Sequence, residues 1–287
     1  YPDNGDFSLS FDGVDDWVDI PSFDLDYPLT IEVSIKAPFQ EGTIIGRGPD
    51  EPIYNETSYV ITVGPQSPNP GLNGQIRWHI GTDGICGYNG GGWNFDDSNI
   101  EINEEQWNNI TTTYDGDDAS IYLDGVNVNT FSHCGNINQN NNNITIGKMY
   151  EDYHFNGQID EIRIWSRIIS QSEFNNFNEE NQDNLLANYK FNSGSGDILY
   201  DHSGNQNHGT IFGASWTENS INQCCFESYG DVNCDTILDI SDIIIIIDMI
   251  LDLINITYDQ NDCADINADG IIDISDLILL IDSILGF

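Results

Sequence analysis

The stretch Phe7-Ser-Leu-Ser-Phe-Asp-Gly-Val-Asp-Asp-Trp-Val-Asp-Ile20 joins two short runs of alternating apolar and polar residues through an acidic turn. Phe7, Leu9 and Phe11 alternate with polar residues before the turn, and Trp17-Val-Asp-Ile20 follows it. A period of two is the pattern of a β-strand with one buried face. The stretch therefore predicts two strands joined by a turn.

The same pattern recurs along most of the chain. Leu29, Ile31, Val33 and Ile35 alternate again, and strand-like runs separated by Gly, Asn, Asp or Pro follow at 43–46, 58–63, 75–80, 107–114, 119–123, 143–147, 158–165, 185–191 and 210–212. Many short strands with almost no helical pattern predict a mostly β fold, an antiparallel sandwich over residues 1–217.

Two segments of this region are expected to differ from the strands. Ser170-Gln-Ser-Glu173 fits a capping box, so a short helix carrying Phe174 and Phe177 should begin there. The Asn-rich segment 136–143 is interpreted as an exposed loop tip. The polar segment around Asp201 and His208 is interpreted as a turn, since Asp, Asn, Ser and Gly are the usual turn residues.

Composition excludes several classes of function. Seven Lys and Arg against 48 Asp and Glu give a net charge of −41, which excludes nucleic-acid binding through phosphate contacts. No apolar run is long enough to span a membrane. Tyr1-Pro-Asp3 lacks a basic and apolar lead, so the chain is expected to be a mature, secreted product.

Six cysteines suggest three disulfides and an oxidising compartment. Cys86 and Cys134 are the pair expected within the large domain, because the other four cysteines cluster near the C-terminus. Connectivity among those four, Cys224, Cys225, Cys234 and Cys263, stays open. Four sequons could carry glycans in a glycosylating host, at Asn55, Asn109, Asn143 and Asn255.

Two acidic loops lie near the C-terminus, at 231–242 and 265–276, offset by 34 residues. Side-chain oxygens fall at positions 1, 3, 5, 9 and 12 of each loop, and an aliphatic residue at position 7 offers its carbonyl. This is the ligand spacing of an EF-hand calcium loop, although Asp stands at position 12 in place of Glu. The predicted ligands are Asp231, Asn233, Asp235, Ile237, Asp239 and Asp242, then Asp265, Asn267, Asp269, Ile271, Asp273 and Asp276.

The repeat continues past the loops, since Ile240-Ser-Asp242 returns as Ile274-Ser-Asp276. A duplicated loop-plus-helix with Asp at position 12 resembles the dockerin family over residues 229–287, after a linker at 218–228. The resemblance implies a small all-α, EF-hand-like domain with two calcium ions that docks onto a cohesin-like protein. Loop positions 10 and 11 would contact the partner, namely Ile240, Ser241, Ile274 and Ser275.

The large domain resembles the laminin-G-like, concanavalin-type jelly rolls. The resemblance rests on Phe7–Ile20, on Trp107-Asn-Asn with Tyr114-Asp-Gly116, on Tyr122-Leu-Asp-Gly125, on Gly157-Gln-Ile-Asp-Glu-Ile-Arg-Ile-Trp165, and on Leu186–Phe191 with Asp201–Gly209. It implies two sheets of six or seven strands packed face to face. It also implies a structural calcium held by Asp12, the Gly13 carbonyl and Asp160.

Carbohydrate binding is the common activity of that family, and a sugar site needs an aromatic platform. The candidates are Trp78 on a strand, and Tyr88 and Trp93 on a Gly-rich loop. Closely spaced catalytic carboxylates on one strand face are missing from the sequence, as are hydrolase and phosphate-loop motifs. The chain is therefore expected to be no enzyme.

Two functions remain open. In the first, the chain is a secreted adhesion or binding module, with a jelly roll that recognises a glycan or surface and a calcium repeat that docks onto a protein. In the second, it is a self-assembling subunit of an extracellular filament or matrix, and the repeat joins neighbouring copies head to tail. The first is preferred, and both require calcium.

Overall fold

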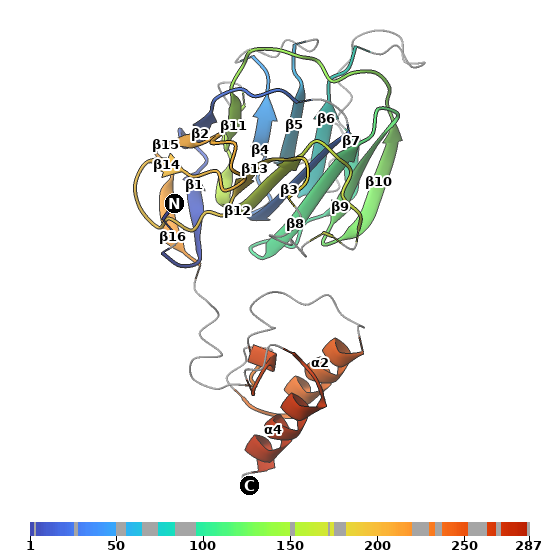
Figure 1. Ribbon diagram of the computed structural model, residues 1–287, viewed down its shortest axis with the longest axis vertical. Helices are drawn as coiled ribbons and strands as arrows, with labels where there is room; N and C mark the ends of the chain where they lie inside the picture. The colour runs from blue at the N-terminus through green and yellow to red at the C-terminus, as the bar shows by residue number, and fades with distance from the viewer. Residues whose placement is uncertain are drawn as a thin grey trace. The chain divides into compact units, whose positions relative to one another are not determined.

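Two antiparallel sheets build the N-terminal unit of this computed structural model (Figure 1). The structure describes the whole chain except residues 3, 26–27, 50–55, 65–73, 84–95, 150–152, 172, 175–181, 220–229, 233–236, 252–262, 268–270 and 286–287. The chain divides into two compact units, Tyr1–Glu218 and Asn219–Phe287.

Sheet A runs in the order β10-β9-β8-β3-β12-β1-β16, and β13 pairs with one end of β12. Its strands are β1 (Phe7–Asp12), β3 (Leu29–Lys36), β8 (Trp107–Tyr114), β9 (Asp118–Leu123), β10 (Val126–Ser132), β12 (Asn156–Trp165), β13 (Leu185–Tyr189) and β16 (Ser215–Glu218).

Sheet B runs in the order β14-β15-β2-β11-β4-β5-β6-β7. Its strands are β2 (Trp17–Ile20), β4 (Gly42–Arg47), β5 (Tyr59–Gly64), β6 (Gln75–Ile80), β7 (Asp96–Glu101), β11 (Ile144–Ile146), β14 (Ile198–Leu199) and β15 (Gly209–Phe212). Both sheets have eight strands, so the expected six or seven per sheet was too low. The strands without a sequence prediction, β7, β10, β14 and β16, are the outermost strands of the two sheets.

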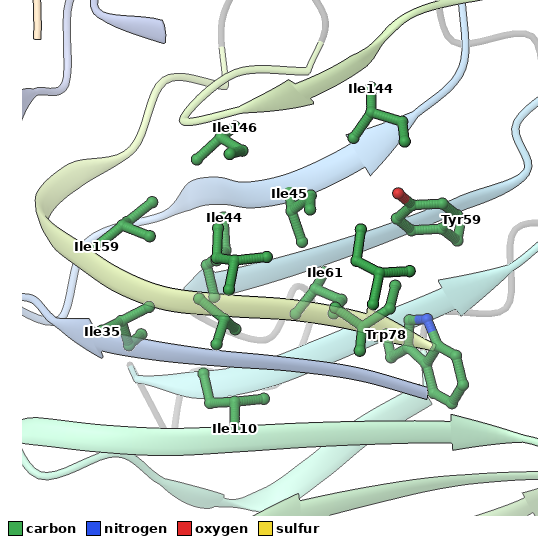
Figure 2. Close-up of a cluster of buried hydrophobic side chains, with 14 of the residues drawn as sticks. Ile35, Ile44, Ile45, Tyr59, Ile61, Trp78, Ile110, Ile144, Ile146 and Ile159 are labelled. Atoms are coloured by element: carbon green, nitrogen blue, oxygen red, sulfur yellow. The ribbon is translucent and has the colours of Figure 1, made fainter. Parts of the chain in front are cut away.

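The core lies between the sheets, where the alternating aliphatic residues meet. Ile35, Ile110 and Ile159 from sheet A face Ile45 and Ile61 from sheet B, and all five are fully buried (Figure 2). Successive side chains of a strand point to opposite faces, so alternate residues of the central strands reach this core. This confirms the predicted antiparallel sandwich.

The segment after β12 covers part of the outer face of sheet A. Trp165, Ile169, Phe174 and Leu185 form a second small core there. Among the described residues, Ser170–Phe174 is a turn and not the predicted helix, while Phe177 lies outside those residues. The Glu173 carboxylate accepts bonds from the Ser170 amide at 2.7 Å and the Ser170 hydroxyl at 2.8 Å, so the capping interaction forms on a single turn.

The Asn-rich segment 136–143 is held in place by a buried cation. The Arg47 guanidinium donates to the carbonyls of Asn140, of Asn142 at 3.3 Å and of Phe23 at 3.0 Å. Desolvation lowers the pKa of Arg47, which is 3% exposed. The interpretation of this segment as a simple exposed tip was therefore wrong, because its backbone satisfies a buried arginine.

Among its described residues, the C-terminal unit contains the helices α2 (Ile240–Ile250) and α4 (Ile274–Leu285). Ile246 and Met249 of α2 pack with Leu280 of α4, Val232 and Ala264 in a separate small core. Each helix follows one of the two acidic loops. None of the helices in the described residues combines the length and apolar character that a membrane crossing requires.

Candidate functional site

In each of the two acidic loops, the carboxylate at position 12 accepts hydrogen bonds from backbone amides of the same loop. Asp242 accepts the amide of Val232 at 2.9 Å and that of Asp239 at 3.0 Å. Asp276 accepts the amide of Asn267 at 3.1 Å and that of Asp273 at 3.0 Å. Each carboxylate therefore ties the start of its loop to the first turn of the following helix.

Position 9 of each loop also caps its helix. Asp239 is the N-cap of α2 and accepts the Ser241 amide at 2.7 Å, and Asp273 accepts the Ser275 amide at 2.6 Å. Bonds from Ser241 and Ser275 lower the pKa of Asp239 and Asp273. Helix capping alone explains these contacts, but it does not explain the long-range contact from Asp242 to Val232.

Buried charge is the unusual feature of the first loop. Asp231 and Asp242, at positions 1 and 12, are 1% and 0% exposed, and Asp276 of the second loop is also 0% exposed. Residues 219–287 contain 14 Asp and Glu and no Lys, Arg or His. Carboxylates buried without a cationic side chain nearby are costly unless another cation offsets them. Hard oxygen ligands in a short loop fit Ca²⁺.

Some of the predicted ligands cannot be placed. Asn233, Asp235 and Asp269 lie outside the described residues, whereas Asp265, Asn267, Ile237 and Ile271 are described. The side chains of Ile237 and Ile271 are exposed.

Asp12 and Asp160, predicted to share one calcium, lie apart. Asp12 pairs with Asn156 across β1 and β12, four residues from Asp160, which corresponds to about 13 Å along the strand. Asp160 is buried opposite Ser34 of β3 and accepts the Glu161 amide at 2.7 Å. The structure therefore does not assemble the predicted site from these residues.

Asp12 instead lies with two other acids in the β1–β2 turn. Carboxylate oxygens of Asp12, Asp15 and Asp16 lie within 4.8 Å of one another. Asp12 accepts the Val14 amide at 2.8 Å, and Asp16 accepts the Asp12 amide at 2.9 Å. Burial raises the pKa of Asp16, and the charges of Asp12 and Asp15 raise it further. The turn itself accounts for these contacts, and Gly13 at φ +78° permits its sharp bend.

Of the three predicted sugar-binding residues, the structure describes Trp78. Trp78 is 1% exposed and packs in the main core beside Tyr59 and Ile61, so it cannot serve as a sugar platform (Figure 2). Trp78 occupies a position of β6 whose side chain points into the core, and aromatic residues on strands are often buried in this way. Tyr88 and Trp93 lie outside the described residues.

The loop around Asp201 is a satisfied turn, as predicted. The buried Asp201 carboxylate accepts amides from Asn188 at 2.9 Å, Ser203 at 2.8 Å and Asn207 at 2.9 Å. Its oxygens are occupied by backbone donors that fix the turn.

The predicted partner-contact residues differ in exposure. Ile240 and Ile274 are 70% and 66% exposed, while Ser241 and Ser275 bind the capping carboxylates Asp239 and Asp273. The two isoleucines begin an aliphatic stripe, defined here as the exposed residues Ile240, Ile244, Ile247 and Leu251, and Ile274, Ile278 and Leu285. Spacings of three, four or seven residues place each set on one helix face.

Cys134 and Cys263 are both disulfide-bonded, and none of the described cysteines is free. Cys86, the predicted partner of Cys134, lies outside the described residues, so this pairing stays a prediction. Of the sequons, Asn109 lies half-buried in β8, where it accepts a bond from Ser34 at 2.7 Å. Asn143 is exposed and donates to Asp19, whereas Asn55 and Asn255 lie outside the described residues.

Comparisons with known proteins agree with this architecture. The family model of the concanavalin A-like lectin/glucanases superfamily, laminin G type, matches residues 12–175. A candidate carbohydrate binding protein from Bacteroides ovatus is similar in fold, with 15% identity and a TM-score of 0.54 over 76% of this chain. The chain spans 61% of that protein.

More distant structures include a pentraxin from Limulus polyphemus, with 16% identity, a TM-score of 0.44, and 59% and 80% of the two chains covered. A domain of a Geobacillus stearothermophilus arabinanase, in complex with arabinotriose, has 19% identity, a TM-score of 0.44, and 58% and 74% covered. No curated protein matches the chain. With the match covering more than half of its residues, the chain belongs to the concanavalin A-like lectin/glucanases superfamily.

Proposed function

We propose that the chain is an extracellular, calcium-dependent binding protein without catalytic activity. Its jelly roll recognises a glycan, and its C-terminal repeat, a dockerin-like domain, docks onto a separate protein. The observation that carries the proposal is the pair of loops closed by fully buried Asp242 and Asp276 in a unit that has no basic residue.

Calcium would link these loops to folding. A cation between the buried carboxylates would offset their mutual repulsion and hold the N-termini of α2 and α4 in fixed positions. An EF-hand-like loop needs ligands from both ends of the turn, and the contacts of Asp242 to Val232 and of Asp276 to Asn267 bring those ends together.

Glycan recognition is supported by the family and by the fold shared with the Bacteroides ovatus protein, which is described as a candidate carbohydrate binder. Disulfide-bonded Cys134 and Cys263 support an oxidising, extracellular location.

The aliphatic stripe supports docking, because seven exposed aliphatic side chains on two short helices exceed what a small unit needs for its own core. Charge favours a separate partner over a second copy. Residues 1–218 hold 34 Asp and Glu against seven Lys and Arg, and residues 219–287 hold 14 acids alone, so either unit of a second copy would be repelled. A partner with an apolar surface flanked by basic residues fits best. Self-assembly into a filament is the second candidate.

The calcium proposal is tested by titrating calcium into the metal-free full chain by calorimetry. We expect two tight sites in the C-terminal unit, and the loss of one in Asp276→Asn. The matched control is Asp282→Asn, which removes the same charge from an exposed position of the same helix. Unchanged calcium uptake in Asp276→Asn would overturn the proposed ligand set.

Sedimentation velocity of the calcium-loaded chain distinguishes the two functions proposed for the aliphatic stripe, docking onto a separate protein and self-assembly. A monomer at micromolar concentration is expected for docking onto a separate partner. Large assemblies that form only with calcium and disappear in Ile240→Ser/Ile274→Ser would establish self-assembly instead.

A further inference from the structure

A polar cavity of about 340 Å³ opens on the outer face of sheet A. Its polar lining comes from Ser10 of β1, Lys36 of β3, Glu105 before β8, and Asn156 and Gln158 of β12. This volume lies within the range of small-molecule sites. The sequence motifs that contain Ser10 and Gln158 indicate the fold and not a ligand site.

The register of four strands aligns part of this lining in one row. Ser10 pairs with Gln158, Gln158 with Lys36, and Lys36 with Trp107. Their neighbours Leu9, Ile159 and Ile35 point into the core, so the row lies on the opposite face. The order along the row is hydroxyl, amide, ammonium and indole.

The polar groups of this row are available to a ligand. Within the described part of the chain, the side chains of Ser10, Lys36, Glu105 and Gln158 make no hydrogen bond or ion pair. Farther along the same face the polar groups are paired, since Arg163 contacts Glu32 at 3.8 Å and Ser34 contacts Asn109 at 2.7 Å. Ser10, Lys36 and Gln158 are half-buried, and Glu105 is exposed at the rim. Unpaired polar groups around a cavity are the arrangement that a polar ligand completes.

Trp107 supplies an apolar surface beside the polar groups. Its side chain is 37% exposed, and its Cβ lies about 5 Å from that of Lys36 as a directly paired residue. Gly157 completes the wall between Asn156 and Gln158, where a Cβ would come 2.5 Å from the Lys36 carbonyl oxygen. The cavity therefore combines donors, acceptors and one aromatic ring.

The charge of the unit selects the class of ligand. One lysine and one glutamate line the cavity, and Tyr1–Glu218 carries a net charge of −27 from 34 acids and seven bases. A polyanion would be repelled, while a neutral polyhydroxylated ring can bind Lys36, Gln158 and Glu105 through hydroxyls and stack on Trp107. We propose that this cavity, with Trp107 beside it, binds a neutral sugar unit of a glycan. The inference rests on the proposed glycan recognition and gives it a location.

The test is a binding panel on the calcium-loaded full chain. The probes are neutral hexasaccharides of β-1,4-glucan, β-1,3-glucan, mannan, xylan and arabinan, and acidic hexasaccharides of galacturonate and chondroitin sulfate. We expect binding to at least one neutral probe, and a loss of roughly tenfold or more in affinity in Trp107→Ala and in Gln158→Ala. The control Phe212→Ala removes an exposed aromatic ring from sheet B and should bind as the wild type does.

Each other outcome has a definite meaning, provided that thermal unfolding shows the variants to be folded. Neutral binding unaffected by Trp107→Ala and Gln158→Ala would overturn this site and leave glycan recognition intact. Binding to acidic probes alone, lost in Lys36→Gln, would overturn the neutral class. If the wild type bound none of the probes, both this site and the proposed glycan recognition would be overturned.

Discussion

Asp242 and Asp276, 34 residues apart, make the same contact: each accepts at 3.0 Å the backbone amide of the residue three positions before it, and neither is exposed. The sequence repeat is therefore also a structural repeat. Because both carboxylates are buried in a unit without a basic residue, the stability of that unit should depend on a bound cation.

Removing calcium should destabilise residues 219–287 selectively. A ligand present at a hundredfold its dissociation constant stabilises the folded form by about 2.7 kcal/mol, which for a unit of this size corresponds to roughly 10–20 °C in Tm. All six Trp residues lie before residue 219, so Trp fluorescence reports the jelly roll, while far-ultraviolet circular dichroism reports α2 and α4.

In excess chelator we expect the Tm followed by circular dichroism of the helices to fall, and the Tm followed by Trp fluorescence to stay unchanged. Added calcium should restore the helical transition. Identical melting of the helices with and without chelator would contradict the proposed calcium dependence.

Trp78 should behave as a core residue and not as a ligand contact. Trp78→Ala is expected to lower the free energy of unfolding by about 3–5 kcal/mol, because a buried ring leaves a cavity. Trp78→Phe should cost less and leave glycan affinity unchanged. Urea denaturation and the glycan panel together measure this, and a loss of affinity without a loss of stability would contradict the placement.

The sequence predicts the strands that face the core and misses those that do not. β3, β5 and β6 carry buried apolar residues on alternate positions, which produces the period-two signal. β7 and β10 lie at sheet edges, and none of the β10 side chains is fully buried, so the alternating pattern weakens there. Edge position, which depends on tertiary pairing, cannot be read from a local pattern.

The candidate sites follow the same rule. The ligands of each calcium loop lie within twelve consecutive residues, so their spacing is a property of the sequence itself. The row of Ser10, Gln158, Lys36 and Trp107 draws one residue from each of four strands. Only the register brings these residues together, and none of the four belongs to a motif that indicates a ligand.

Glu173 should contribute stability that depends on pH. The Arg167 guanidinium at 2.7 Å, with further bonds from Ser170, lowers the pKa of Glu173 to about 2. A depressed carboxyl pKa gives stability that is present above the unfolded value of about 4.3 and is lost as pH falls toward 2. The stability difference between the wild type and Glu173→Gln should therefore be constant above roughly pH 5 and shrink below it.

Urea denaturation at several pH values measures this difference, and added salt should reduce it because the pair is partly exposed. Glu218→Gln, which removes an exposed carboxylate from β16, is the control for a general change in charge. A difference that stays constant down to pH 3 would contradict the role of the Arg167–Glu173 pair.

Substitutions of Leu280 and Ile278 in α4 should differ in their effect on stability, because Leu280 belongs to the core of the C-terminal unit and Ile278 to the aliphatic stripe. Leu280 is 0% exposed and packs against Ile246, whereas Ile278 is 53% exposed. With calcium present, Leu280→Ala should cost about 2–5 kcal/mol and Ile278→Ala less than about 0.5 kcal/mol, measured by urea denaturation followed through circular dichroism. A cost for Ile278→Ala similar to that for Leu280→Ala would show that the stripe is covered within the folded chain, and it could not then be the docking surface.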